Sequence, residues 1–184
     1  MINRLIIVHG WGGSPETDFL PWAKEELQKK SYEVITPVMP ETDYPKIEKW
    51  VPYLAKVIGE PRKDDILIGH SIGCQTILRY LENLPDGQKV DRVILVAGFV
   101  TLTGLTDDQV IVARPWLESP INLGNIRNHA NSFTAIFSDN DPFVPWEENK
   151  KLFEEKLGAQ IFTEHNKGHF NEMPQECPDL LSLF

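Results

Sequence analysis

The stretch DILIGHSIGCQTILRYLENL, residues 65–84, decides the fold. It opens with an apolar run, Ile66–Ile68, which is typical of a strand covered on both faces. After the turn Gly69–Gly73 (GHSIG), apolar residues recur at helical spacing from Cys74 to Leu84. A Gly-X-Ser-X-Gly turn between a strand and a helix lifts its serine above the sheet, and its glycines avoid collisions in the tight turn. The same letters also fit an ordinary glycine turn with a helix-capping serine.

The same two kinds of element recur along the whole chain, because short apolar runs alternate with amphipathic stretches. The other predicted strands are Leu5–Val8, Tyr32–Val38, Val93–Val96, Phe133–Phe137 and Ala159–Thr163. The other predicted helices are Phe19–Lys30, Ile47–Ile58, Trp146–Leu157 and a short closing helix within Pro174–Phe184. This alternation predicts a three-layer α/β/α fold with a mainly parallel sheet of about six strands.

One segment, Thr101–Asn131, departs from this alternation. We expect it to form a short cover over the sheet edge, with one or two brief helices. It is too short for a large cap domain, so the site beneath it should be fairly open.

Length and composition narrow the classes of function. A chain of 184 residues fits one domain, residues 1–184. A formal net charge of −9 without a basic run argues against a nucleic-acid partner. No segment resembles a secretory signal or approaches the roughly 20 apolar residues that span a bilayer. We therefore expect a soluble, cytoplasmic protein with no membrane partner.

The two cysteines, Cys74 and Cys177, have no metal-ligand spacing and suggest no disulfide framework. We expect two reduced thiols, with no metal site and no cofactor.

Ser71 is the candidate nucleophile, since the predicted turn exposes it at the start of a helix. The free N–H groups of that helix end lie where an oxyanion would develop, and the N–H of Ile72 is the first candidate donor. Acyl transfer to serine needs a second donor from another loop. The turn His9–Gly13 (HGWGG) follows the first predicted strand, and the N–H of Trp11 is our second candidate. An ordinary strand-to-helix turn would look similar.

The stretch 138–145 (SDNDPFVP) follows another predicted strand and offers two aspartates. A carboxylate on such a loop can fix the tautomer of a catalytic histidine and stabilise its cation. We favour Asp141, because the residues after it lead into a helix. Asp139 remains the alternative, although it could instead bond local backbone and shape the turn.

His169 is the candidate general base, because it lies on the loop after the last predicted strand. His9 and His70 flank the glycine turns and are expected to support them. His129 falls in the cover, and a structural role is expected for His165. The order Ser71, Asp141, His169 matches the serine–acid–histidine order of α/β-hydrolases.

On these motifs the chain resembles the YdeN-like small α/β-hydrolases, the group of the serine hydrolase first named as a retinoblastoma-binding protein. The resemblance covers nearly the whole chain. Its other matching segments are Pro21-Trp22, Met39-Pro40, Leu78-Arg79-Tyr80 and Arg114-Pro115-Trp116. It implies an α/β-hydrolase (Rossmann-like) core without a large cap, the triad Ser71, Asp141 and His169, and esterase or aminopeptidase-like activity. Cys74 stands where the family commonly has a small residue after the Gly-X-Ser-X-Gly turn, and we expect it only to pack.

The expected reaction is therefore hydrolysis of a small-molecule ester or amide through an acyl-enzyme on Ser71, in the manner of a carboxylesterase. Trp116, Phe143 and Phe170 are candidate substrate-binding residues, although aromatic residues in such positions often only pack the cover. One alternative is an aminopeptidase-like serine hydrolase that releases a bulky or aromatic residue. Another is a protein-binding scaffold that retains the hydrolase fold. The sequence indicates no particular protein partner.

Overall fold

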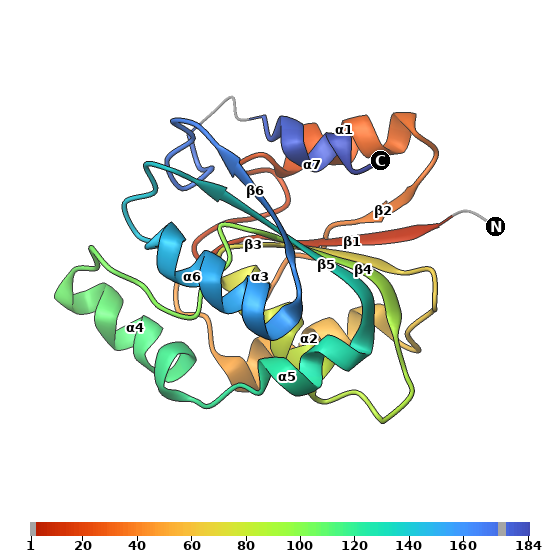
Figure 1. Ribbon diagram of the computed structural model, residues 1–184, viewed down its shortest axis with the longest axis horizontal. Helices are drawn as coiled ribbons and strands as arrows, with labels where there is room; N and C mark the ends of the chain where they lie inside the picture. The colour runs from red at the N-terminus through yellow and green to blue at the C-terminus, as the bar shows by residue number, and fades with distance from the viewer. Residues whose placement is uncertain (1–2, 173–175) are drawn as a thin grey trace.

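A six-stranded, all-parallel sheet forms the centre of the molecule in the computed structural model, which describes residues 3–172 and 176–184 (Figure 1). The spatial order of the strands is β2-β1-β3-β4-β5-β6. The strands are β1 (Arg4–Val8), β2 (Glu33–Ile35), β3 (Ile66–His70), β4 (Val90–Val96), β5 (Ala130–Ser138) and β6 (Gln160–Glu164). The predicted parallel α/β/α architecture is confirmed. All strands end at the same edge of the sheet, so the loops after them can meet there.

Helices cover both faces of this sheet (Figure 1). One face carries α1 (Leu20–Lys29) and α7 (Pro178–Ser182). The other carries α2 (Ile47–Ile58), α3 (Ile72–Glu82), α5 (Leu123–Ile126) and α6 (Trp146–Leu152), the last continued by a π-helical turn, η2 (Phe153–Leu157). Helix α1 buries Leu20, Ala23 and Leu27 along one stripe, as its spacing predicts. Two apolar clusters, one on each face, make up the core. No helix in the described part of the chain combines the length and apolarity needed to cross a membrane.

The structure differs from the sequence prediction at several element ends. Strand β2 has three residues rather than the seven of Tyr32–Val38, because it is an edge strand and Pro37 has no N–H to donate. Strand β5 begins three residues before Phe133, inside the segment predicted as cover. The closing helix begins at Pro178, and residues 174–175 of that prediction lie outside the described residues.

The cover is more helical than predicted. Its main element is α4 (Asp107–Glu118), a helix of 12 residues rather than a brief one. A capping box explains where it begins: the Thr106 hydroxyl accepts from the Gln109 N–H, and the Gln109 side chain accepts from the Thr106 N–H. After α5 comes a 3₁₀ turn, η1 (Arg127–His129), which leads directly into β5. As predicted, the cover forms no large cap domain.

Arg79 on α3 holds the C-terminal end of α4. Its buried guanidinium donates to the backbone carbonyls of Trp116, Ser119 and Pro120. Carbonyls at a helix C-terminus lack intrahelical partners, so an arginine satisfies groups that burial would otherwise leave unpaired. The helix that begins beside Ser71 therefore also anchors the cover.

A buried ion pair joins the opposite, amino-terminal edge of the sheet. The Arg4 guanidinium at the start of β1 contacts both carboxylate oxygens of Asp65, which precedes β3, at 2.8 and 2.6 Å. Arg4 also donates to the Ile58 carbonyl, and Asp65 is fully buried. The hydrogen bond to Asp65 holds the pKa of Arg4 above its usual value, against the effect of burial. The pair therefore ties two central strands and the end of α2 together.

Replacing Arg4 by alanine should lower the free energy of unfolding by about 3–5 kcal/mol, because the Asp65 carboxylate is left buried without its partner. Urea denaturation followed by circular dichroism measures this. Lys29→Ala is the control, since it breaks ion pairs with Glu25 and Glu26 on an exposed helix face and should barely change the midpoint. Equal effects of the two substitutions would contradict the importance given to the buried pair.

Candidate active site

Three side chains from three separate loops meet at the carboxyl-terminal edge of the sheet. Ser71 follows β3, Asp141 lies three residues after β5, and His169 lies on the loop after β6. The Ser71 Oγ lies 2.9 Å from His169 Nε2, and His169 Nδ1 lies 2.8 Å from Asp141 Oδ2. This chain of contacts could pass a proton from the hydroxyl to the imidazole and stabilise the resulting cation.

The backbone at Ser71 has a conformation that side chains rarely adopt, with φ 52° and ψ −119°. Two glycines make this turn possible. A Cβ on Gly69 would lie 2.7 Å from the Cys74 backbone, and one on Gly73 would lie 2.4 Å from the Val8 carbonyl oxygen. The first turn of α3 therefore lies directly against the end of β1. The contact with β1 requires Gly73, and Gly69 allows the end of β3 to lie against the backbone of the same helical turn.

The two candidate oxyanion donors lie on either side of this contact. The N–H of Ile72 is at the first position of α3, where no preceding carbonyl can accept it. Trp11 lies in the turn after β1, which Gly12 continues with φ 66° and a hydrogen bond to the Thr42 carbonyl. The Trp11 indole donates to the Asp43 carbonyl and so fixes this turn from its other side.

The structure gives the two competing aspartates different partners. Asp141 Oδ1 accepts from the N–H groups of Phe143 and Val144, which leaves Oδ2 to His169. Asp139 instead accepts from the Asn166 N–H and contacts His165 Nδ1 at 2.6 Å. The Asn166 bond, together with that to His165, lowers the pKa of Asp139. Asp139 therefore shapes the loop, while Asp141 contacts His169.

Sequence reasoning missed two further residues that hold the loop after β6, which carries His169 and is called the histidine loop below. Ser138 Oγ accepts from the Lys167 N–H, and Asn140 Oδ1 accepts from the Gly168 N–H. Together with Asp139 and Asp141, these side chains bond successive positions of the segment 165–169. The pairing of β5 with β6 in register brings the two segments together. Polar residues at four consecutive positions after a strand were the available sign.

The other histidines have partners of their own. His9 accepts from the Met39 N–H at Nε2 and lies 2.8 Å from the Gly10 carbonyl at Nδ1, an arrangement that a neutral ring satisfies. Burial lowers the pKa of His9, which favours the same form. His129 contacts the Gln88 carbonyl, far from Ser71. His70 lies between Asp18 and the His169 backbone.

A cavity of about 380 Å³ opens beside Ser71. Trp11, Ile72 and Phe143 line it, and the cover contributes an apolar wall of Leu102, Leu105 and Ala113. This wall is fixed to the loop that carries Asp141, because the Thr103 N–H donates to the Phe143 carbonyl.

Two of the three predicted substrate-binding aromatics do not line this cavity. Trp116 is buried, donates its indole N–H to the Pro45 carbonyl and packs edge-on against Trp50. Phe170 is fully buried and packs against Phe19 on the other face of the sheet. Both side chains belong to the core, since their neighbours cover them completely. Phe143, whose ring meets the His169 ring edge-on at 5.4 Å, is the one on the cavity wall.

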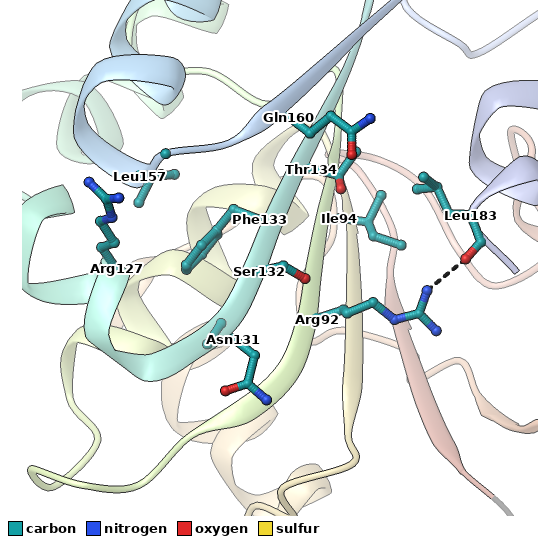
Figure 2. Close-up of a pocket in the computed structure, with 12 residues that line it drawn as sticks. Arg92, Ile94, Arg127, Asn131, Ser132, Phe133, Thr134, Leu157, Gln160 and Leu183 are labelled. Carbon is teal, nitrogen blue, oxygen red and sulfur yellow. Dashed lines mark hydrogen bonds between the residues drawn. The ribbon is translucent and has the colours of Figure 1, made fainter.

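A second cavity, of about 420 Å³, lies at the amino-terminal end of β4, β5 and β6 (Figure 2). Figure 2 shows Arg92 and Arg127 pointing away from one another on either side of β5, with Arg92 bonded to the Leu183 carbonyl. The residues that line this cavity include no histidine, cysteine or carboxylate side chain. It therefore offers no base for hydrolysis.

Cys74 is poorly suited to act as an alternative nucleophile near Ser71. Cys74, directly after the turn Gly69–Gly73, is fully buried, and burial raises the pKa of its thiol. Within residues 3–172 and 176–184, no group of three histidine, cysteine or acidic side chains is arranged to hold a metal ion.

Gly73→Ala should disturb both stability and the site, because its methyl group would collide with the Val8 and His9 carbonyls. We expect a loss of about 1–3 kcal/mol of stability, measured by thermal denaturation. Gly124→Ala, where the new Cβ would meet only the Asn122 side chain at 3.4 Å, should have little effect. A fully native Gly73→Ala protein would show that α3 and β1 are not in such close contact.

Known proteins resemble this chain over nearly its whole length. A family model described as serine hydrolase matches residues 5–175. The chain is 27% identical to YdeN of Bacillus subtilis (strain 168) over 176 residues, covering 94% of this chain and 88% of YdeN. It is 24% identical to the serine hydrolase RBBP9 of Rattus norvegicus over 168 residues, covering 90% of this chain and 80% of that protein.

Solved structures of other proteins share the fold of this chain. The crystal structure of the ydeN gene product of B. subtilis gives a TM-score of 0.88 at 25% identity, covering 98% of this chain and 96% of that one. A structure from work on carboxylesterases of the thaumarchaeon Nitrososphaera gargenis shares the fold, with a TM-score of 0.75 at 16% identity, and covers 100% of this chain and 89% of that one. By the match over residues 5–175, this chain is a member of the serine hydrolase family.

Proposed function

We propose that the chain is a carboxylesterase-like serine hydrolase that cleaves small esters through an acyl-enzyme on Ser71. One observation carries the proposal. The hydroxyl of Ser71, the imidazole of His169 and the carboxylate of Asp141 form a continuous hydrogen-bonded chain beside an open cavity. Membership of the serine hydrolase family supports hydrolysis, and the substrate class is our inference.

In this mechanism His169 Nε2 accepts the proton of Ser71 as its Oγ attacks the ester carbonyl carbon. Asp141 accepts the Nδ1–H bond and stabilises the imidazolium. The N–H groups of Ile72 and Trp11 stabilise the oxyanion. The imidazolium then protonates the leaving alcohol, and the carbonyl re-forms as the acyl-enzyme. Water, deprotonated by His169, attacks this intermediate and releases the acid and free Ser71.

The shape and chemistry of the cavity favour a substrate with an apolar group. Leu102, Leu105 and Phe143 form one side of it, while the side nearer Ser71 carries backbone N–H groups and polar side chains. An apolar chain on the substrate would lie against the cover, where contact removes it from water. The polar side would receive the ester carbonyl.

Labelling with a fluorophosphonate probe tests the nucleophile. The native protein should be labelled within minutes at neutral pH, because His169 activates the hydroxyl of Ser71, and Ser71→Ala should not be labelled. Ser132→Ala is the matched control, since Ser132 is exposed on β5 away from the site, and it should label like the native protein. Correctly folded native protein without label would favour the scaffold alternative.

The apolar wall predicts chain-length selectivity. Leu105→Ala removes part of the wall and should lower kcat/KM for p-nitrophenyl octanoate about 5- to 30-fold, at roughly 1–2 kcal/mol of lost contact, with little change for the acetate. Val110→Ala, on the exposed side of the same cover, should leave both values unchanged. Equal losses for both esters would contradict this placement. Higher activity on aminoacyl p-nitroanilides than on any ester would favour the aminopeptidase-like alternative.

A further inference from the structure

His70, the residue before the candidate nucleophile, contacts an acceptor through each of its ring nitrogens. Its Nδ1 lies 3.1 Å from a carboxylate oxygen of Asp18, and its Nε2 lies 2.9 Å from the backbone carbonyl oxygen of His169. The His70 side chain is 2% exposed and that of Asp18 is 13% exposed. Neither contact belongs to the chain of hydrogen bonds proposed to perform the reaction.

Two acceptors around one imidazole are best satisfied when both of its ring nitrogens carry a proton. A neutral ring has one N–H, so its other nitrogen would turn a lone pair towards an oxygen lone pair. The imidazolium has two N–H groups and satisfies both contacts. Asp18 matches this as a carboxylate: burial opposes its ionisation, but the bond to His70 and the charges of the nearby histidines outweigh burial and lower its pKa.

Several parts of the site converge on this pair. A Cβ on Gly10, in the turn before Trp11, would lie only 3.0 Å from His70 Nδ1, so the turn and the ring are in close contact. The Phe19 ring packs edge-on against His70 at 5.4 Å. The His70 ring centre lies 5.2 Å from that of His169. His9, just after β1, also lies close enough for its charge to interact with that of His70.

We infer that the Asp18–His70 ion pair is a positioning unit for the base: protonated His70 donates one N–H to the His169 carbonyl and the other to Asp18. The segment 138–141 holds the histidine loop through its N–H groups, and His70 holds it through the carbonyl of His169 itself. The backbone of His169 is thus held on both sides, which positions its Nε2 at 2.9 Å from the Ser71 Oγ.

The charge of the pair also matters to the reaction. During attack His169 becomes an imidazolium beside another imidazolium, and two like charges at this distance repel. Asp18 compensates, because its carboxylate interacts with both His70 and His169. The Asp18 carboxylate therefore offsets part of this repulsion.

Two substitutions at His70 separate its contacts. In His70→Gln the amide nitrogen takes the place of Nε2, so the bond to the His169 carbonyl can persist. In His70→Asn the amide reaches only the place of Nδ1, so that bond is lost while a contact with Asp18 remains. The inference rests on the proposed function for its kinetic test. We expect kcat for an ester to fall about 100-fold in His70→Asn and less than about tenfold in His70→Gln, with KM little changed in both.

His129→Asn is the matched control, because it makes the same change at another buried histidine whose partner is the Gln88 carbonyl. It should keep native kcat. Equal losses in the Asn and Gln variants of His70 would overturn the inference, since packing alone would then explain them. Native kcat in His70→Asn would overturn it as well.

A spectroscopic test needs no substrate and so stands apart from the proposed function. In ¹⁵N-detected spectra of the folded protein at neutral pH, His70 should show a proton on both ring nitrogens. In Asp18→Asn the amide can donate to Nδ1, so His70 should become neutral and keep only its Nε2–H. A neutral His70 in the native protein would overturn the ion pair, even if the enzyme hydrolyses esters as proposed.

Discussion

The close contact between α3 and the end of β1 is the constraint on which the site depends. Because Gly73 leaves no room for even a methyl group beside the Val8 carbonyl, the helix begins almost on top of the neighbouring strand. The chain can make this contact only by turning sharply at Ser71, where φ is positive. The turn projects the hydroxyl over the sheet and sets the Ile72 N–H beside the loop that carries Trp11. A single packing requirement thus fixes the positions of Ser71 and of the Ile72 N–H.

The acid and the base depend on a second relationship, the pairing of neighbouring strands. Ser138, the last residue of β5, pairs in register with Glu164, the last residue of β6, so the loops that follow run beside one another. Each side chain of the segment 138–141 bonds a different residue of the segment 165–169. A shift of register by one position would break all of these bonds together. The contact between Asp141 and His169 is therefore part of the sheet's own geometry rather than an isolated pair.

Much of this arrangement was predictable from sequence, because it rests on local patterns. Glycines around a serine, apolar runs of strand length and polar residues after strands indicate a parallel sheet with side chains gathered at its carboxyl edge. The structure brings Ser71, Asp141 and His169 together, and their catalytic roles remain our proposal. The direction of a large side chain was not predictable in the same way. Trp116 and Phe170 lie on segments near the site but point into the core, where they pack against Trp50 and Phe19.

The ends of some elements and the contacts of His70 could not be predicted from the sequence for a related reason. Strand β2 ends early because it lies at an edge of the sheet just before Pro37, and strand order cannot be deduced from a run of apolar letters. The double role of His70 depends on Asp18 and on a carbonyl 99 positions along the chain. Pairings of this kind arise when the loops fold over the sheet, and no spacing in the sequence encodes them.

The ion pair of Arg4 and Asp65 has a consequence for how such a chain can change over time. It fastens the strands at the edge remote from Ser71, because parallel strands start at one rim and finish at the other. Substitutions in the cover or the cavity lie at the carboxyl-terminal edge of the sheet and leave this ion pair intact. During evolution the loops could therefore change to accept new substrates while the ion pair at the amino-terminal edge continues to stabilise the fold.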